Sequence, residues 1–144
     1  MSQTTLDIKE PGLNVLPPGV ERHVVNAGGL TGLQIFPDDE IEIINEEGNQ
    51  ICEIICFDKD GKSELGILNQ KENCKKSFIK ELLKGKDESS LITNLQLKKR
   101  NLDINKSKSS ILFDEQTPSG EKIKIKSKDK CYVIFAAPQN NMLV

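Results

Sequence analysis

Short segments suited to β-strands recur through the first half of the chain at a spacing of about ten residues. Residues 30–36, 40–45 and 50–57 are predicted as strands, because each is rich in β-branched or other apolar residues and is bounded by turn-forming residues. Within 40–45, polar and apolar residues alternate, as in a strand that is buried on one face. Pro37, which two aspartates follow, and the run Glu46–Asn49 supply the intervening turns. Strands joined by such short turns pair antiparallel, so the sequence predicts an antiparallel β-sandwich or barrel.

Four further segments have strand character. They are residues 22–26, 110–113, 121–126 and 131–136. Lysines alternate with isoleucines through the third of these segments, which is a pattern by which an edge strand avoids pairing with other chains. The last segment is apolar throughout, which indicates a central strand that is covered on both faces.

The apolar period changes to a helical one after residue 69. Cys74, Phe78 and Leu82 recur every four residues and predict a helix over residues 70–84. Asn69 is the expected N-cap, since a Glu three residues later completes the pattern of a capping box.

A second helical candidate covers residues 89–99 and contains Leu91, Ile92 and Leu95. Apolar residues also fall on alternate positions there, so a strand is the alternative, and we favour the helix. The predicted fold class is therefore α+β: a mainly antiparallel β-sandwich or barrel with one or two inserted helices.

The length of 144 residues suits one domain. Residues 1–20 hold three prolines and two glycines with little periodicity, and we interpret them as an extended N-terminal arm. Residues 21–144 then form a single β-rich domain with a helical insertion at about 70–100. The three apolar residues Met142–Val144 have two interpretations: a tail that tucks onto the core, or the end of a piece of a longer polypeptide. We favour the second.

The cysteine and histidine content argues against a metal centre. The four cysteines are Cys52, Cys56, Cys74 and Cys131; no Cys-x-x-Cys pair occurs, and the chain has one histidine. We expect free, buried thiols in a reducing compartment. No apolar run reaches the roughly 18 residues that span a bilayer, and the first residues lack a secretory signal, so a cytoplasmic location without membrane contact is predicted.

Charge is divided unevenly along the chain. Residues 1–70 carry 13 acidic and 4 basic residues, whereas residues 71–144 carry 9 acidic and 16 basic residues. One interpretation is a nucleic-acid-binding face, and the other is two faces that attract each other or a neighbouring domain. Eighteen of the twenty basic residues are lysine and few aromatic residues accompany them, so we favour the second interpretation.

Few residues are candidates for chemistry. Glu53 interrupts an apolar strand, so its carboxylate either sits near a pocket as an acid or base, or pairs with a lysine or arginine across strands; we favour the pairing. Asn49 and Gln50 lead into the same strand and are candidate ligand-binding residues beside Glu53. His23 is the only side chain that titrates near neutral pH, and we interpret it as a surface or structural residue rather than a catalyst.

The stretch from His23 to Phe57 resembles the urea-carboxylase-associated family, a β-rich family of largely unassigned function. The likeness rests on Ala27-Gly28-Gly29, Asp38-Asp39, Ile41–Ile44 and Glu47-Gly48-Asn49-Gln50 before an apolar strand. In that family an aspartate usually stands at the position of Glu53. The Asp, His and Cys positions thought to matter for the family's activity have no counterpart after Gly61. The resemblance implies metabolism of urea- or guanidine-like nitrogen compounds.

Domains of this kind also resemble those fused ahead of folate-dependent aminomethyltransferases of the glycine-cleavage T-protein family. This resemblance implies an accessory N-terminal domain of a one-carbon or nitrogen-metabolism enzyme, not catalytic alone. Its partner would be a downstream catalytic domain or a partner subunit. Tetrahydrofolate would then bind that fused or partner domain, with no cofactor bound by this chain. The alternatives are a stand-alone small-molecule enzyme or binding protein that uses Glu53, Asn49 and Gln50, and a lysine-rich interaction module.

Overall fold

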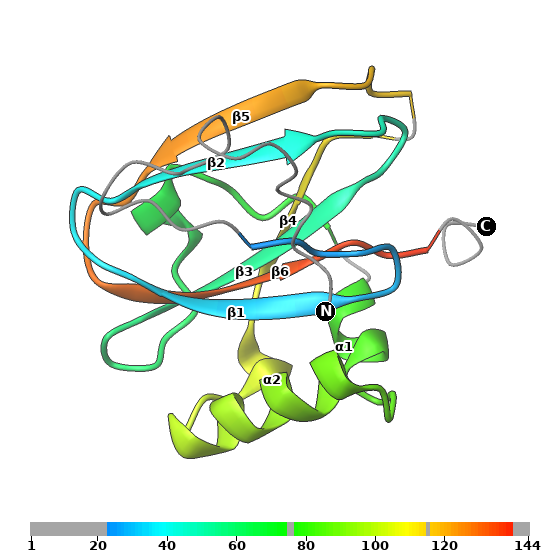
Figure 1. Cartoon of the computed structure of the whole chain (residues 1–144). Coiled ribbons are helices and arrows are strands. Elements are labelled where there is room, and N and C mark those ends of the chain that lie inside the picture. Colours follow the sequence, from blue (N-terminus) through cyan, green and yellow to red (C-terminus); the bar gives the residue numbers. More distant parts are fainter. Residues whose placement is uncertain (1–22, 75–76, 115, 140–144) are drawn as a thin grey trace, which may run out of the picture.

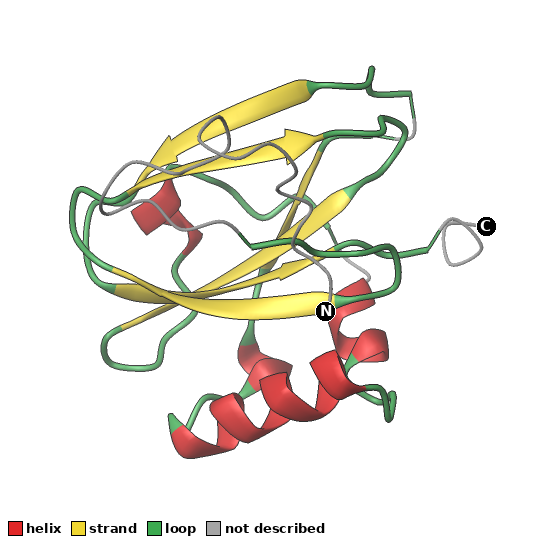
Figure 2. Cartoon of the chain, viewed as in Figure 1, coloured by secondary structure: helices red, strands yellow, loops and turns green. Residues whose placement is uncertain are grey.

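The structure, a computed structural model, describes residues 23–74, 77–114 and 116–139. The predicted arm at 1–20 and the apolar end Met142–Val144 lie outside these residues. Six strands and two α-helices follow one another through the described residues, as Figures 1 and 2 show. The strands are β1 (Leu30–Ile35), β2 (Glu40–Asn45), β3 (Cys52–Asp58), β4 (Ser109–Leu112), β5 (Glu121–Lys126) and β6 (Cys131–Ala136); the helices are α1 (Phe78–Leu82) and α2 (Glu88–Lys99).

The strands form two antiparallel sheets. Four strands pair in the order β1-β6-β3-β4, and β2 pairs with β5 in a separate two-stranded sheet. The prediction of β6 as a central strand is confirmed, because every residue of Cys131–Ala136 is buried. The lysines of β5 are exposed while Ile125 is buried, so the predicted alternation along this strand is also confirmed.

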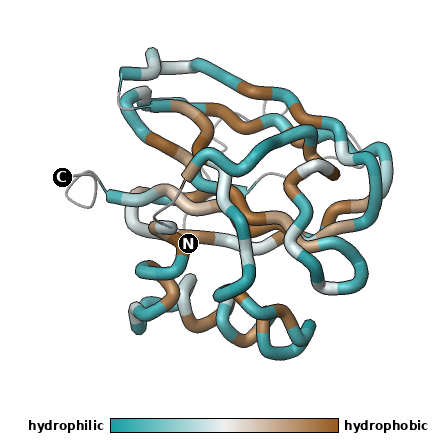
Figure 3. The backbone as a smooth tube through the Cα atoms, turned by 180° about the vertical axis from the view of Figure 1, so that it is seen from behind, coloured by the Kyte–Doolittle hydropathy of each residue, from teal (hydrophilic) through white to brown (hydrophobic). Residues whose placement is uncertain are grey.

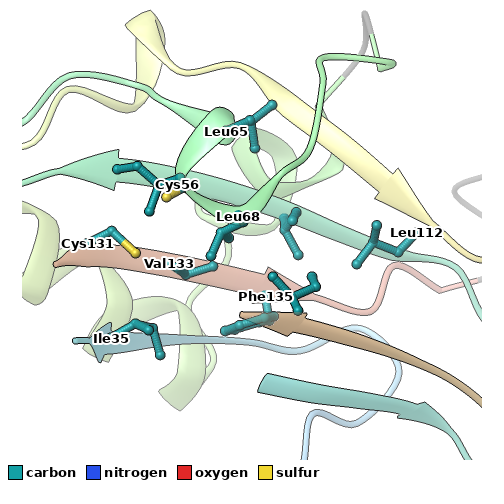
Figure 4. Close-up of a cluster of buried hydrophobic side chains, with 11 residues drawn as sticks. Ile35, Cys56, Leu65, Leu68, Leu112, Cys131, Val133 and Phe135 are labelled. Atoms are coloured by element: carbon teal, nitrogen blue, oxygen red, sulfur yellow. The ribbon is translucent and has the colours of Figure 1, made fainter. Parts of the chain in front are cut away.

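The four-stranded sheet is the middle layer of the fold. One face packs against the β2–β5 sheet around apolar residues of both sheets, some of which Figure 4 shows. The other face packs against the helices, which lie on the side away from β2 and β5 in Figure 1. Neighbouring residues of β3 point to opposite faces, so Ile54 and Cys56 belong to the first core and Ile55 and Phe57 to the second. The α+β sandwich prediction is confirmed, and the described strands do not close into a barrel.

The predicted helix at 70–84 is wrong over its first half. Asn69 ends a short 3-10 helix, Leu65–Leu68, in the left-handed conformation with φ 60°, so it does not start an α-helix. Cys74 forms an isolated β-bridge with Ser109. The helix begins only at Phe78, where the hydroxyl of Ser77 accepts a hydrogen bond from the Lys80 amide. Tertiary pairing with β4 therefore overrides the helical spacing of the sequence.

The predicted strand at 22–26 is also wrong for its described residues, 23–26, which have no strand pairing. The chain joins the sheet only after a tight turn at Gly28, where φ is 84°. The Gly28 amide donates to the Ala137 carbonyl, and the Ala137 amide donates to the Gly29 carbonyl. These two bonds set the register of β1 against β6 and place the start of the strand at Leu30.

The second helical candidate is confirmed as α2, but its buried side holds two hydroxyl residues beside Leu97, while three large aliphatic residues are exposed. Ser90 and Thr93 are buried against the rest of the protein, whereas Leu91, Ile92 and Leu95 are exposed. The buried hydroxyls have local partners: Ser90 donates to the Leu82 carbonyl, and Thr93 donates to the Ser89 carbonyl. Because these hydroxyls are satisfied, burying them costs little.

None of the described helices is long and apolar enough to cross a bilayer.

Asp87 is the N-cap of α2, and replacing it tests how much its carboxylate stabilises the fold. It accepts a hydrogen bond from the Ser89 hydroxyl at 2.6 Å and shares the single proton of the Ser90 hydroxyl with the Leu82 carbonyl, at 2.7 Å from each, and these bonds hold the pKa of Asp87 below its usual value. We expect Asp87→Ala to lower the free energy of unfolding by about 1 kcal/mol at pH 7, measured by urea denaturation.

The pH dependence of this effect has a definite sign. The lowered pKa means that the ionised cap stabilises the fold fully above the unfolded-state pKa of about 3.9, and that this contribution is lost as the pH falls through the folded pKa. Asp87→Asn keeps an acceptor oxygen without the charge. The stability difference between wild type and Asp87→Asn should therefore shrink between pH 7 and pH 3. A difference that stays constant over this range would contradict the assignment.

Candidate functional site: the buried Glu53 carboxylate

Glu53 lies in the middle layer of the fold, on the face of β3 that packs against the helices, and its side chain is 0% exposed. Four hydrogen bonds reach its carboxylate. The Phe78 and Ile79 amides donate to Oε1 at 2.7 and 3.1 Å. The hydroxyls of Ser77 and Ser109 donate to Oε2 at 2.7 and 2.6 Å. The carboxylate thus joins β3, β4 and the first turn of α1.

This arrangement satisfies the carboxylate entirely within the protein. An ionised carboxylate has about four acceptor positions, and the four donors occupy them. The two amides belong to the first turn of a five-residue helix, and such a short helix has little stability of its own. Glu53 compensates the partial positive charge at that helix end, where a negative group is most favourable. The predicted pairing of Glu53 with a lysine or arginine is therefore wrong: hydroxyls and amides supply the donors, and the carboxylate is a charged anchor for α1.

Asn49 and Gln50 lie in the turn between β2 and β3 and contact other parts of the chain. Asn49 adopts the left-handed conformation with φ 57°, and its backbone amide donates to the Thr117 carbonyl. The Gln50 side-chain amide donates to the carbonyls of Ile51 and Pro138. These bonds tie the turn to the β4–β5 loop and to the segment after β6. Among the described contacts, none joins either residue to the Glu53 carboxylate.

His23 is exposed at the start of the described residues, before the turn that leads into β1. Beside this region an open cavity of about 560 Å³ is lined by residues 24–30, 87–89 and Gln139. A second open cavity, of about 450 Å³, is lined mainly by residues 68–70 and 124–128. The lining of neither cavity includes Glu53, Asn49 or Gln50. The structure therefore places the predicted site residues at separate points instead of around one pocket.

Cys52 and Cys56 lack the environment of a nucleophile, whereas hydrogen bonds from Cys56 and Ser127 lower the pKa of the buried Cys131 thiol to about 7. None of the four cysteines is in a disulfide, and Cys56 and Cys131 are buried between the sheets. Burial and then the negative charge of Glu53 raise the pKa of the Cys52 thiol to about 12, so this group stays protonated at neutral pH. The hydrogen bond between the Cys56 and Cys131 thiols, together with burial, raises the pKa of Cys56. Within the described parts of the chain, no group of three His, Cys, Asp or Glu side chains is placed to hold a metal ion.

Sequence reasoning missed a cluster around Tyr132, in which three distant segments meet on the helix face of the sheet. The Arg100 guanidinium lies 4.5 Å from the centre of the Tyr132 ring and donates to Gln34 Oε1 at 2.7 Å. Arg100 is the C-cap of α2, so it fixes the end of that helix to β1 and β6. Burial raises the pKa of Tyr132, and its hydroxyl has no partner among the described residues. The rarity of arginine in this lysine-rich chain was the sequence signal that could have pointed to Arg100.

A comparison with known proteins finds one relevant relative. The chain is 34% identical over 131 residues to trimethylamine-oxide aldolase from Ruegeria pomeroyi. The match covers 91% of this chain but only 17% of the aldolase, so the chain spans about a sixth of the length of this relative. No protein-family model matches the chain, and no solved structure matches it significantly. The resemblance to the urea-carboxylase-associated family is thus not confirmed.

Proposed function

We propose that this chain is an accessory, non-catalytic β-domain of a larger enzyme that acts on small nitrogen compounds. The observation that carries this proposal is the match to a sixth of trimethylamine-oxide aldolase over nearly the whole chain. The hydrogen bonding of the buried Glu53 carboxylate also supports this proposal. A general acid or base must exchange protons with a substrate, whereas the four acceptor positions of Glu53 are taken by donors of the protein itself.

The larger enzyme that we infer is an aldolase with trimethylamine oxide, or a related methylated amine, as its substrate. The link to aminomethyltransferases that the sequence predicts is kept as part of this proposal. Tetrahydrofolate would then bind a fused or partner domain. Under this proposal, the present domain contributes to assembly or shapes access to an active site that lies in the remaining part of the enzyme.

A chimeric enzyme tests the proposal directly. The matched segment of the Ruegeria pomeroyi aldolase is replaced by this chain, and consumption of trimethylamine oxide is followed by the loss of its methyl signal in proton NMR. We expect the chimera to keep activity within about tenfold of the aldolase, whereas deletion of the segment should abolish it, because misplacing an active site by about 1 Å can cost a hundredfold in rate.

Two controls separate an accessory role from a catalytic one. A chimera that carries Glu53→Gln should retain kcat below its unfolding temperature, because the substitution affects the anchoring of α1 and leaves the reacting groups in place. The isolated 144-residue chain should consume no trimethylamine oxide, urea or guanidine. Turnover of any of these compounds by the chain alone would contradict the proposal, as would loss of kcat in a correctly folded Glu53→Gln chimera.

The stand-alone enzyme or binding protein remains the alternative, and it makes a different prediction. In that case Glu53→Gln would abolish ligand binding while leaving the melting temperature nearly unchanged. Titration calorimetry with urea, guanidine and trimethylamine oxide on the 144-residue chain distinguishes the two. The separate positions of Glu53, Asn49 and Gln50 give this alternative less support.

A further inference from the structure

The exposed face of α2 carries an apolar stripe made of Leu91, Ile92 and Leu95. These side chains are 53, 50 and 64% exposed, which is unusual for neighbouring large aliphatic residues on one helix. At about 100° per residue the three side chains fall within roughly a quarter to a third of the helix circumference. The buried residues Ser90 and Thr93 lie on the opposite side. The stripe therefore faces away from the protein's own core.

The position of α2 leaves this stripe accessible to another helix. Figure 1 shows α2 as the outermost element on the helix side of the four-stranded sheet. Figure 3 shows, from behind, that apolar and hydrophilic segments alternate along the helices at that side of the molecule. The C-terminus of α2 is fixed by Arg100 and its N-terminus by Asp87, so the stripe is presented by a helix whose two ends are held.

Charges at the two ends of the stripe are opposite. Glu88 is exposed in the first turn of α2, and Lys98 and Lys99 are exposed in the last turn. Glu88 and Lys99 lie in the same sector of the helix as the leucines, because residues 88, 91, 95 and 99 follow one another at intervals of three or four positions. The apolar residues are centred near the midpoint of the 12-residue helix, close to Thr93.

We propose that the stripe is a contact surface for a second copy of this chain, with two α2 helices packed antiparallel about a two-fold axis near Thr93. In this arrangement Leu91 and Ile92 of one protomer pack against Leu95 of its partner at a helix separation of about 8–10 Å. Glu88 of each protomer meets Lys98 and Lys99 of the other. The antiparallel dipoles of the two helices also attract. This order of charges on a symmetric apolar stripe makes the surface complementary to itself.

The inference does not depend on the proposed function, since it concerns the 144-residue chain alone. One helix per protomer gives an interface at the small end of specific ones, below about 1,200 Å² in total, so we expect a reversible dimer with a dissociation constant in the micromolar range. Sedimentation equilibrium of the chain from about 1 to 500 μM should show a monomer–dimer equilibrium that weakens as salt is added.

Leu95→Lys removes the most exposed residue of the stripe and tests the apolar contact. It should raise the dissociation constant at least about tenfold and leave the melting temperature unchanged, because Leu95 contributes little to the core. The matched control is Phe36→Lys, since Phe36 is also about half exposed but lies after β1, outside the stripe. It should leave dimerisation unchanged.

A charge exchange tests the register. Glu88→Lys alone, and the pair Lys98→Glu with Lys99→Glu, should each weaken the dimer several-fold, because like charges then oppose each other across the two-fold axis. The triple variant restores complementarity and should restore the dissociation constant to within about twofold. Three results would each overturn the proposal. The chain could stay monomeric to about 500 μM, or the dimer could survive Leu95→Lys. The triple variant could also dimerise as weakly as the variants that change the charge at one end only. A monomer would leave the stripe to another partner, such as the rest of a larger enzyme.

Discussion

Replacing Glu53 with alanine should lower the free energy of unfolding by at least about 3 kcal/mol, because four donors then lose their acceptor inside the protein. The Phe78 and Ile79 amides lose the acceptor that satisfied them, and the missing side chain leaves a cavity between β3 and α1. Against a typical total of about 5–15 kcal/mol, such a loss brings the protein close to unfolding at 25 °C. Urea denaturation followed by circular dichroism measures it.

Glu53→Gln is the more selective change. Its amide oxygen can still accept from the Phe78 and Ile79 amides, and the hydroxyls of Ser77 and Ser109 can rotate to accept from its NH₂ group. What disappears is the charge, so we expect a loss of about 1–3 kcal/mol. The control is Glu42→Gln, which removes an exposed glutamate 3.8 Å from Lys124 and should change stability by less than about 0.5 kcal/mol. Equal effects of the two changes would contradict the anchoring role of Glu53.

Gly32→Ala should be the second most damaging change, although it adds only one methyl group. A Cβ at position 32 would lie 1.9 Å from the Tyr132 hydroxyl oxygen and 2.5 Å from the ring carbon that bears it. The ring cannot simply turn aside, because it is buried and Arg100 lies over it. Either β1 or the ring must move, and overpacking of this kind costs about 1–3 kcal/mol. Thermal and urea denaturation measure the loss.

A second glycine and a double variant check the cause. At Gly66 an added Cβ would come closest to the tip of the Glu64 side chain, which can move, so Gly66→Ala should be neutral or slightly stabilising. Replacing the tyrosine ring in Tyr132→Leu removes the ring atoms and the hydroxyl that would obstruct a Cβ at position 32. Gly32→Ala should therefore cost much less in the Tyr132→Leu background than in the wild type, and additive effects would show that the two residues do not collide.

The strands were predictable because their signal is local. In β5, lysine and isoleucine alternate along one segment of five residues, and burial of Ile125 with exposure of the lysines follows from the pleat alone. In β6 a continuous apolar run needs cover on both faces, which only a central strand between two layers provides. The sequence also predicted buried thiols outside disulfides: none of the four is in a disulfide, but only Cys56 and Cys131 are buried, and Cys52 and Cys74 are half-buried.

The failures concern segments whose conformation depends on distant partners. Cys74 has helical spacing with Phe78, yet it pairs with Ser109, which is 35 positions away along the chain. The residues before Leu30 have strand-like composition, but the bonds from Gly28 and Gly29 to Ala137 decide where pairing starts. In each case the competing interaction has a high sequence separation, so no local pattern could report it.

For the candidate site, the sequence by itself determined that a carboxylate stands within an apolar strand and that few other groups could take part in chemistry. Only the tertiary structure decided what that carboxylate does, because its donors come from α1 and β4, 24 to 56 positions further along the chain. The same holds for α2. Its sequence favoured a helix over a strand, but the local hydroxyl bonds of Ser90 and Thr93 allowed these residues to be buried and left Leu91, Ile92 and Leu95 facing outward. Local periodicity determines which elements form, whereas which face is covered depends on the free energy of packing the whole chain.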